Sequence, residues 1–171
     1  MSSPNQTPTA SIYDAQAFEA FCKTHRLDPH LMKQLRNAYF KKQRSSADAT
    51  TLLSPSLQAI FRQQCAWECL SLAQTKHSER DGATKLLFNT DKGEPVEGVI
   101  LRIDSGRTSF CVSSATGCNI GCRFCATGRL SGGTSLRSAE IIDQVVQANQ
   151  LLRQEGRYVR NVVFMGMGEP L

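Results

Sequence analysis

The sequence lacks the two features that direct a chain to a membrane or a secretory route. No apolar run is long enough to span a bilayer, and the N-terminus has no basic stretch followed by an apolar one. We therefore expect a cytoplasmic protein with no membrane partner. The opening residues are instead rich in Ser, Thr and Pro, which predicts a disordered tail over residues 1–12.

A disulfide framework is also disfavoured, because the chain has seven cysteines, an odd number. Four of them fall between positions 111 and 125, and such clustering in a reducing compartment favours metal or redox chemistry. The 171 residues suffice for one domain, or for a small domain and part of a larger one. The net charge of +5 is compatible with an RNA or DNA partner, but a slightly basic surface explains it equally well.

Apolar residues recur at helical spacing through the first part of the chain. They predict one helix over residues 14–26 and a second from Pro29, which Asp28 is placed to cap. The basic end of the second helix, residues 36–44, either complements the helix dipole or contacts phosphate. Residues 45–51 are polar and predict a loop.

A third helical stretch opens at Ser54 and carries apolar residues as far as Leu72, so we predict a helical accessory domain of RNA-binding type over residues 13–82. Cys65 and Cys69 are four residues apart and would share one side of this helix. They could ligate a metal, but their bulky neighbours favour a place in the core.

The middle of the chain carries strand patterns. Residues 84–90 and 96–103 predict two strands joined by a turn at Gly93, which we interpret as a β-hairpin linker over residues 83–103. A third strand, over residues 108–114, leads directly into the cysteine cluster.

After the cluster, Ser138 is placed to cap a helix that ends near Gly156. Asn161 to Met165 then form a continuous apolar run, typical of a parallel strand buried on both faces. The order strand, helix, strand predicts an α/β fold with one βαβ unit over residues 104–171. In such folds the carboxyl ends of the strands carry the active site.

The clustered cysteines stand at a spacing of three and then two intervening residues, in Cys118-Asn-Ile-Gly-Cys122-Arg-Phe-Cys125. Thiolates are soft ligands, and flanking glycines let the backbone turn so that the sulfurs converge on one metal centre. A structural zinc site usually takes four protein ligands, yet Cys111 lies seven residues upstream and no His is near. Three ligands leave one coordination position open, as a four-iron cluster chelated by a substrate or cofactor requires.

The C-x3-C-x2-C motif resembles that of the radical S-adenosylmethionine (SAM) enzymes. Further stretches resemble the RlmN/Cfr family of radical SAM methyltransferases, which act on an adenine of 23S ribosomal RNA. These stretches include Phe110-Cys-Val-Ser-Ser114 and Asn161-Val-Val-Phe-Met-Gly-Met-Gly-Glu-Pro-Leu171. The resemblance is close over residues 82–171 and loose before them. It implies a helical domain followed by the first βαβ part of a radical SAM partial (β/α)6 barrel.

The resemblance also implies a cofactor site. Cys118, Cys122 and Cys125 would hold a 4Fe-4S cluster, SAM would chelate its free iron, and Gly168 and Glu169 would contact the SAM amino group. In the family, one SAM methylates a cysteine near the C-terminus. A second is cleaved to a 5′-deoxyadenosyl radical, which takes a hydrogen from that methyl group so that it can attack the adenine.

Two catalytic roles are implied as well. Cys111 matches the family cysteine that resolves the protein–RNA crosslink and pairs transiently, in a disulfide bond, with the methyl-carrying cysteine. Glu97 matches an acid proposed as a proton acceptor, although its pattern alone is that of an exposed strand carboxylate. The implied partners are 23S rRNA, tRNA as a second candidate substrate, and an electron donor such as flavodoxin. The sequence does not choose between C2 and C8 of the adenine.

The sequence departs from the family in two places. Residues 131–135 stand where the family has an aromatic residue and an Arg-Asn pair, and the chain stops at Leu171, after the second parallel strand. We therefore expect an incomplete barrel without the methyl-carrying cysteine, and no methylation of RNA by this chain alone.

Two other functions fit the same residues. A zinc-binding RNA-interaction module would use Cys111 together with Cys118, Cys122 and Cys125. An iron–sulfur protein of electron transfer or sensing would use the cysteines without SAM.

Overall fold

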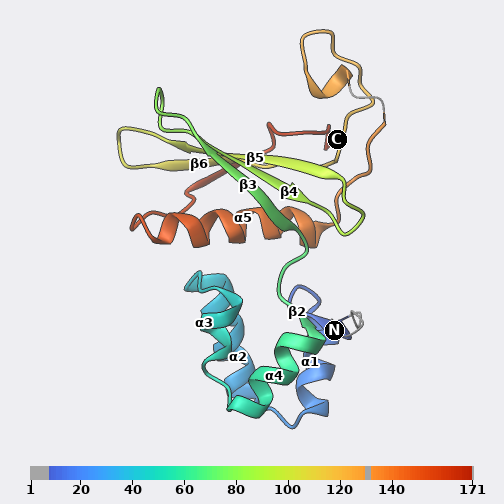
Figure 1. Cartoon of the computed structure of the whole chain (residues 1–171), viewed down its shortest axis with the longest axis vertical. Helices are drawn as coiled ribbons and strands as arrows, with labels where there is room; N and C mark the ends of the chain where they lie inside the picture. Colours follow the sequence, from blue (N-terminus) through green and yellow to red (C-terminus); the bar gives the residue numbers. More distant parts are fainter. Residues whose placement is uncertain (1–7, 130–131, 171) are drawn as a thin grey trace, which may run out of the picture. The chain divides into compact units, whose positions relative to one another are not determined.

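The computed structural model describes residues 8–129 and 132–170 of the chain (Figure 1). The chain divides into two compact units, Met1–Glu68 and Cys69–Leu171. The first unit ends before residue 82, where we expected the helical domain to end, because a strand occupies Ser71–His77. In the described ranges, no helix is both long enough and apolar enough to cross a membrane.

The first unit consists of short helices and a two-stranded parallel sheet. Its elements are α1 (Ala15–Thr24), α2 (Pro29–Arg36), a π-helical turn (Asn37–Lys41), α3 (Ser46–Thr50), α4 (Pro55–Gln64), β1 (Ala10–Ser11) and β2 (Cys65–Ala66). Asp28 caps α2 as predicted, because its carboxylate accepts the His30 N–H at 2.7 Å. The buried rings of Phe18 and Phe61 meet edge to face, with centroids 6.2 Å apart.

Two predictions for irregular segments of this unit are wrong. The tail expected over residues 1–12 contains β1, since residues 10 and 11 pair with β2, although residues 1–7 lie outside the described part. The loop expected over residues 45–51 contains α3. Ser45 caps that helix by accepting the Asp48 N–H at 3.1 Å, and this local capping outweighs the polar composition.

The third helix was also predicted wrongly, because α4 ends at Gln64 and does not continue to Leu72. Cys65 lies in β2 and Cys69 follows it, so the two do not share a helix face. The reason is tertiary: the backbone N–H of Cys69 donates at 2.6 Å to the buried carboxylate of Asp143, far along the chain. Cys65 is buried, as the core interpretation required, and Cys69 is half-buried.

The second unit is built on a five-stranded sheet with one helix on one side (Figure 1). The strands lie in the order β3-β4-β5-β6-β7, with bounds Ser71–His77, Thr84–Asn89, Pro95–Arg102, Thr108–Cys111 and Asn161–Val163. The first three pairs of neighbouring strands are antiparallel, whereas β7 is parallel to β6. The helix α5 (Ser138–Arg153) connects these two, which confirms the predicted βαβ unit.

The predicted hairpin forms, but it lies inside the sheet. β4 and β5 are its second and third strands, and Gly93 in their turn has a φ of +79°. Their alternate residues face α5 and build the core of the unit, which comprises Leu70, Leu86, Phe88, Val96, Ile100, Phe110, Val112, Leu136, Ala148 and Leu152. The residues that alternate with these along β4 and β5 point to the other face of the sheet.

The ends of α5 fit the sequence prediction only in part. Gly156, with a φ of +67°, stops the helix as predicted. At the start, Arg137 and not Ser138 is the N-cap, and the Glu140 side chain accepts the Arg137 N–H at 2.7 Å. The Glu140 carboxylate also accepts a hydrogen bond from the Arg137 guanidinium at 3.0 Å, so it caps the helix start in place of a serine hydroxyl.

The prediction that the last strand is buried on both faces is wrong. β7 lies at the edge of the sheet with β6 as its neighbour, and Val162 and Met165 are exposed, Met165 to 78%. Within the described residues this apolar run is mostly exposed, and only Val163 is half-buried.

Candidate functional site

The segments that follow β6 and β7 continue side by side beyond the sheet. Val112 N–H donates to the Val163 carbonyl at 2.9 Å, and Gly166 N–H donates back to the Val112 carbonyl at 3.1 Å. Further on, Ser114 N–H donates to the Met167 carbonyl at 2.8 Å. The segment that leads into the cysteines is therefore bonded directly to the Gly-Met-Gly turn.

The two glycines of this turn are required by close packing. A Cβ on Gly166 would lie 2.5 Å from the Ser113 hydroxyl oxygen, and a Cβ on Gly168 would lie 2.7 Å from that of Ser114. Gly168 also has a φ of +97°, which side chains rarely adopt. Glu169, the next residue, is thus held at the carboxyl edge of the sheet.

Ser113 is a functional-site residue that the sequence did not reveal. It is fully buried, and its hydroxyl donates to the Glu97 carbonyl at 2.5 Å and accepts the Met167 N–H at 2.7 Å. The side-chain amide of Gln144, on α5, accepts the Ser113 N–H and donates to the Ser113 carbonyl, both at 3.0 Å. One serine therefore joins β5, α5 and the Gly-Met-Gly turn.

The two ends of the cysteine loop are hydrogen-bonded to each other. Thr116 N–H donates to the Thr134 carbonyl, and Thr134 N–H donates to the Thr116 hydroxyl, each at 3.0 Å. A Cβ on Gly117 would approach the Gly132 carbonyl oxygen to 2.1 Å. Glycine is therefore needed where the two arms of the loop meet. Of residues 131–135, which depart from the family, residue 131 lies outside the described part of the chain.

The three cysteines of the loop are free and half-buried. Backbone hydrogen bonds from Gly128 and Thr127 lower the pKa of the Cys125 thiol, and this favours the thiolate that binds metal. Within residues 8–129 and 132–170, no three His, Cys, Asp or Glu side chains stand close enough to hold a metal ion as arranged. The donor set still fits a thiophilic cluster, because residues 116–134 contain no His, Asp or Glu that would compete with the thiols.

Glu97 and Cys111 share the face of the sheet opposite α5. Cys111 is the register partner of Val99, and Glu97 lies two residues before Val99 on the same strand. Burial raises the pKa of the Cys111 thiol. The Glu97 carboxylate forms a 3.0 Å ion pair with Lys85, and the two side chains are about half exposed, at 43% and 50%.

Glu97 and Cys111 thus lie on one face of the sheet. The cysteine loop and the Gly168–Glu169 turn both extend from the same edge of that sheet, at the carboxyl ends of β6 and β7.

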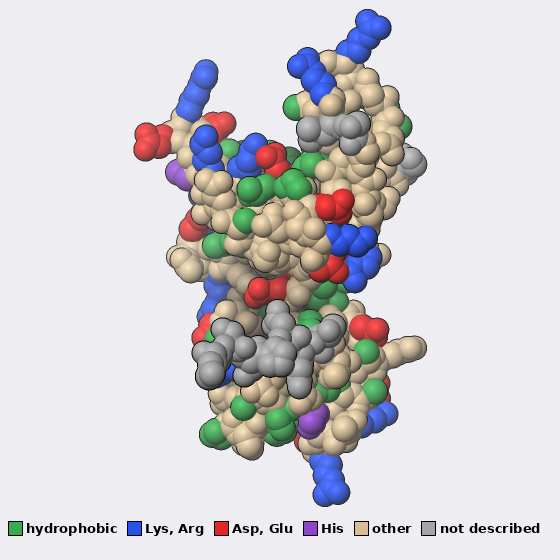
Figure 2. All heavy atoms as spheres, turned by 45° about the vertical axis from the view of Figure 1, so that its right-hand side comes forward, with side chains coloured by type: hydrophobic (Ala, Val, Ile, Leu, Met, Phe, Trp, Pro, Cys, Tyr) green, Lys and Arg blue, Asp and Glu red, His purple; other side chains and the backbone are tan. Residues whose placement is uncertain are grey.

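Phe124, between the second and third cysteines, is 92% exposed. On the face drawn in Figure 2, Lys and Arg side chains are scattered among Asp and Glu, so overall charge marks no nucleic-acid site there.

The fold is similar to that of a crystal structure of a radical SAM methyltransferase from Sphaerobacter thermophilus. The TM-score is 0.83 at 31% sequence identity, over 94% of this chain and 48% of that chain. The βαβ unit with its cysteine loop therefore has the architecture of the radical SAM methyltransferase class. No family model matches the chain.

Curated relatives show which family within this class the chain resembles. The chain is 48% identical over 160 residues to a probable RNA methyltransferase of Rhodopirellula baltica, covering 94% of this chain and 41% of the relative. It is 34% identical over 170 residues to the dual-specificity RNA methyltransferase RlmN 1 of Myxococcus xanthus, covering 98% of this chain and 47% of the relative. It is 32% identical over 153 residues to the ribosomal RNA large subunit methyltransferase Cfr of Bacillus velezensis, covering 90% of this chain and 43% of the relative.

The chain belongs to the RlmN/Cfr family of RNA methyltransferases, as its motifs predicted. It spans about half the length of the curated relatives it matches.

Proposed function

We propose that this chain carries the cofactor-binding part of a radical SAM methyltransferase that modifies an adenine of 23S rRNA. The observation that carries the proposal is the junction of two segments: the root of the C-x3-C-x2-C loop is hydrogen-bonded to the Gly-Met-Gly-Glu turn. A metal centre and an amino-acid moiety bound to it would have to meet at such a junction.

The cysteine loop would provide the metal ligands, namely Cys118, Cys122 and Cys125. A bound 4Fe-4S cluster supplies the electron for reductive cleavage of SAM. Gly168 would offer backbone groups and Glu169 a carboxylate to the SAM amino group. A carboxylate suits this role because it pairs with an ammonium group through charge-assisted hydrogen bonds.

The face of the sheet would provide the groups that act on RNA. Glu97 would accept a proton from the adenine ring, and its ion pair with Lys85 holds the carboxylate in place. Cys111 would release the methylated product, and the partial burial of its thiol raises the thiol pKa. The second, methyl-carrying cysteine would come from the part of the relatives that this chain does not match.

The structure of the second unit is compatible with the start of a (β/α)6 barrel, in which β6, α5 and β7 form the first βαβ unit. Further proposals follow from the family: tRNA as a second substrate, C2 or C8 as the methylated atom, and flavodoxin as electron donor. Because two parallel strands do not enclose a substrate, we expect no methyl transfer to rRNA fragments by this chain in an anaerobic assay. Transfer by the isolated chain would overturn this expectation.

Metal analysis after anaerobic reconstitution tests the proposal. We expect about four iron and four sulfide per chain and brown colour, with loss of both in C118A, C122A and C125A. The half-buried Cys69 gives the control, since C69S should load normally. Colourless, stoichiometric zinc that also requires Cys111 would instead support the zinc-binding RNA module. An iron–sulfur centre with no SAM binding, tested with E169Q as reference, would support the electron-transfer alternative.

A further inference from the structure

Four residues form a continuous row across the sheet of the second unit. In the strand register, Cys111 on β6 pairs with Val99 on β5, Val99 pairs with Lys85 on β4, and Lys85 pairs with Lys76 on β3. At about 4.8 Å between strands, the row extends roughly 14 Å from the Cys111 position. The sheet thus aligns two lysines with a candidate catalytic cysteine.

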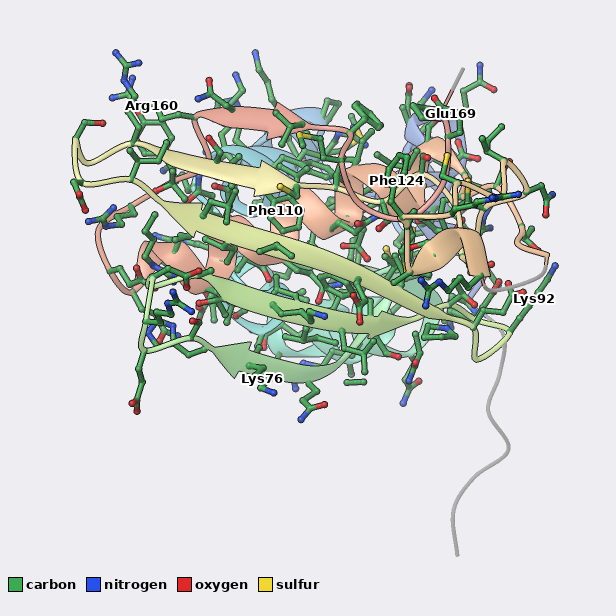
Figure 3. The ribbon with its side chains drawn as sticks, turned by 90° about the horizontal axis from the view of Figure 1, so that it is seen from above. Lys76, Lys92, Phe110, Phe124, Arg160 and Glu169 are labelled. Atoms are coloured by element: carbon green, nitrogen blue, oxygen red, sulfur yellow. The ribbon has the colours of Figure 1, made fainter. Side chains whose placement is uncertain are left out.

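This row lies on the face that α5 does not cover. The residues that alternate with it, such as Leu86, Ile100 and Phe110, are buried in the core against α5. Side chains alternate along a strand, so the row points to the opposite side. Figure 3 looks onto this face, with α5 behind the strands and Lys76 at the β3 edge.

The charges on this face are unbalanced. Lys76 and Lys85 are direct cross-strand partners, and like charges in such positions repel. Lys85 is compensated by Glu97 at 3.0 Å, whereas exposed Lys76 forms no ion pair with any described residue. An anion bound between the two ammonium groups would remove the repulsion.

The next row on the same face consists of two uncharged side chains and the Glu97 carboxylate. Gln74 pairs with Leu87, and Leu87 pairs with Glu97. Leu87 and Val99 are half-buried, so each presents part of an apolar side chain beside the lysines. The face therefore combines cations for phosphates with amide and apolar groups for nucleobases, next to Glu97.

We propose that this face binds a single-stranded segment of RNA, with Lys76 and Lys85 on its phosphates and the bases directed toward Glu97 and Cys111. The choice of RNA rests on the proposed function. Phosphate contacts position a nucleic acid without reading its sequence, and a guiding surface beside the reacting groups needs only that.

The first test measures binding of a fluorescein-labelled single-stranded RNA to the full 171-residue chain, without metal or SAM, over a series of salt concentrations. The double variant K76Q/K85Q should bind at least several-fold more weakly, and its log–log salt slope should fall by about 1.4, which is about 0.7 for each lost phosphate contact. K85R, which keeps the charge, should retain the affinity of the original chain.

The matched control is R153Q, which removes one positive charge from the exposed end of α5 on the covered side of the sheet. Equal affinity and slope for R153Q and K76Q/K85Q would overturn the proposal, and so would the absence of RNA binding by the original chain. Because this assay needs no cofactor, its failure is distinct from a failure of the chain to load iron or to bind SAM.

A second test needs no variant. Acetylation of lysines with an amine-reactive reagent, read by mass spectrometry, should show RNA protecting Lys76 and Lys85 but not Lys23 in α1. Uniform protection of all three, or protection by poly-glutamate but not by RNA, would contradict the proposal. The second result would assign the face to an acidic protein partner instead.

Discussion

Single residues in this chain differ most clearly in the chemistry of their thiols. Burial raises the pKa of Cys22 to about 11, and burial raises those of Cys65 and Cys69 to about 12. The pKa of Cys125 is instead lowered by backbone N–H groups of Gly128 and Thr127. Position in the fold thus separates inert thiols from one that is prepared to ionise.

Alkylation should follow this order. In the metal-free chain at neutral pH, we expect iodoacetamide to modify Cys125 first and Cys22, Cys65 and Cys69 last, because the thiolate is the reacting form. Peptide mass spectrometry over a pH series measures the order. Modification of Cys65 before Cys125 in the folded chain would contradict the assigned environments.

Ser113 should be costly to replace, because its hydroxyl satisfies the Glu97 carbonyl and the Met167 N–H in the interior. We expect S113A to lose about 1–3 kcal/mol of unfolding free energy, measured by urea denaturation. Ser109, half-buried on β6, supplies the control, and S109A should change the value by about 0.5 kcal/mol or less. Equal effects of the two substitutions would show that the Ser113 hydrogen bonds add no stability.

At the scale of the element, the N-terminus of α5 depends on one buried carboxylate. Burial acts to raise the pKa of Glu140, but hydrogen bonds from the Arg137 side chain and backbone outweigh it, so the pKa lies below the usual 4.5. A carboxyl group whose pKa is lowered in the folded state stabilises it above the unfolded value. This contribution disappears as the pH falls through the lowered pKa.

The pH dependence of stability should therefore change when Glu140 is made neutral. We expect E140Q to cost about 1 kcal/mol at pH 7 and progressively less below pH 4.5, so that the two unfolding curves converge in acid. Urea unfolding from pH 3 to pH 7 measures this. A constant difference over the whole range would mean that the charge on Glu140 does not matter.

At the scale of the whole molecule, the exposed edge of the second sheet is the main liability. Among the described residues β7 has one hydrogen-bonded neighbour, β6. Val162 in β7 and Phe164 and Met165 just after it are exposed. Unpaired strand edges with apolar side chains associate with other chains.

The chain alone should consequently self-associate at high concentration. We expect V162K to shift the chain toward monomer in sedimentation or light-scattering measurements, because a lysine on an edge strand opposes pairing. I142K places the same charge at an exposed apolar residue of α5, away from the edge. If I142K has the same effect, general solubility and not the strand edge controls association.

Local spacing alone predicted the features whose causes are local. The Asp28 cap, the turn at Gly93 and the stop at Gly156 follow from backbone conformations within a few residues. The cysteine spacing and the Gly-Met-Gly-Glu turn marked the family correctly, since ligand spacing and close glycine contacts are written in consecutive residues.

Tertiary structure alone decided the rest. The strand at Ser71–His77 depends on pairing with β4, and the chain entering it is held by Asp143 on α5. Ser113 gains its role from groups 16 to 54 residues away, and the row from Lys76 to Cys111 exists only through strand register. Such contacts join distant parts of the chain, so no window of the sequence contains them.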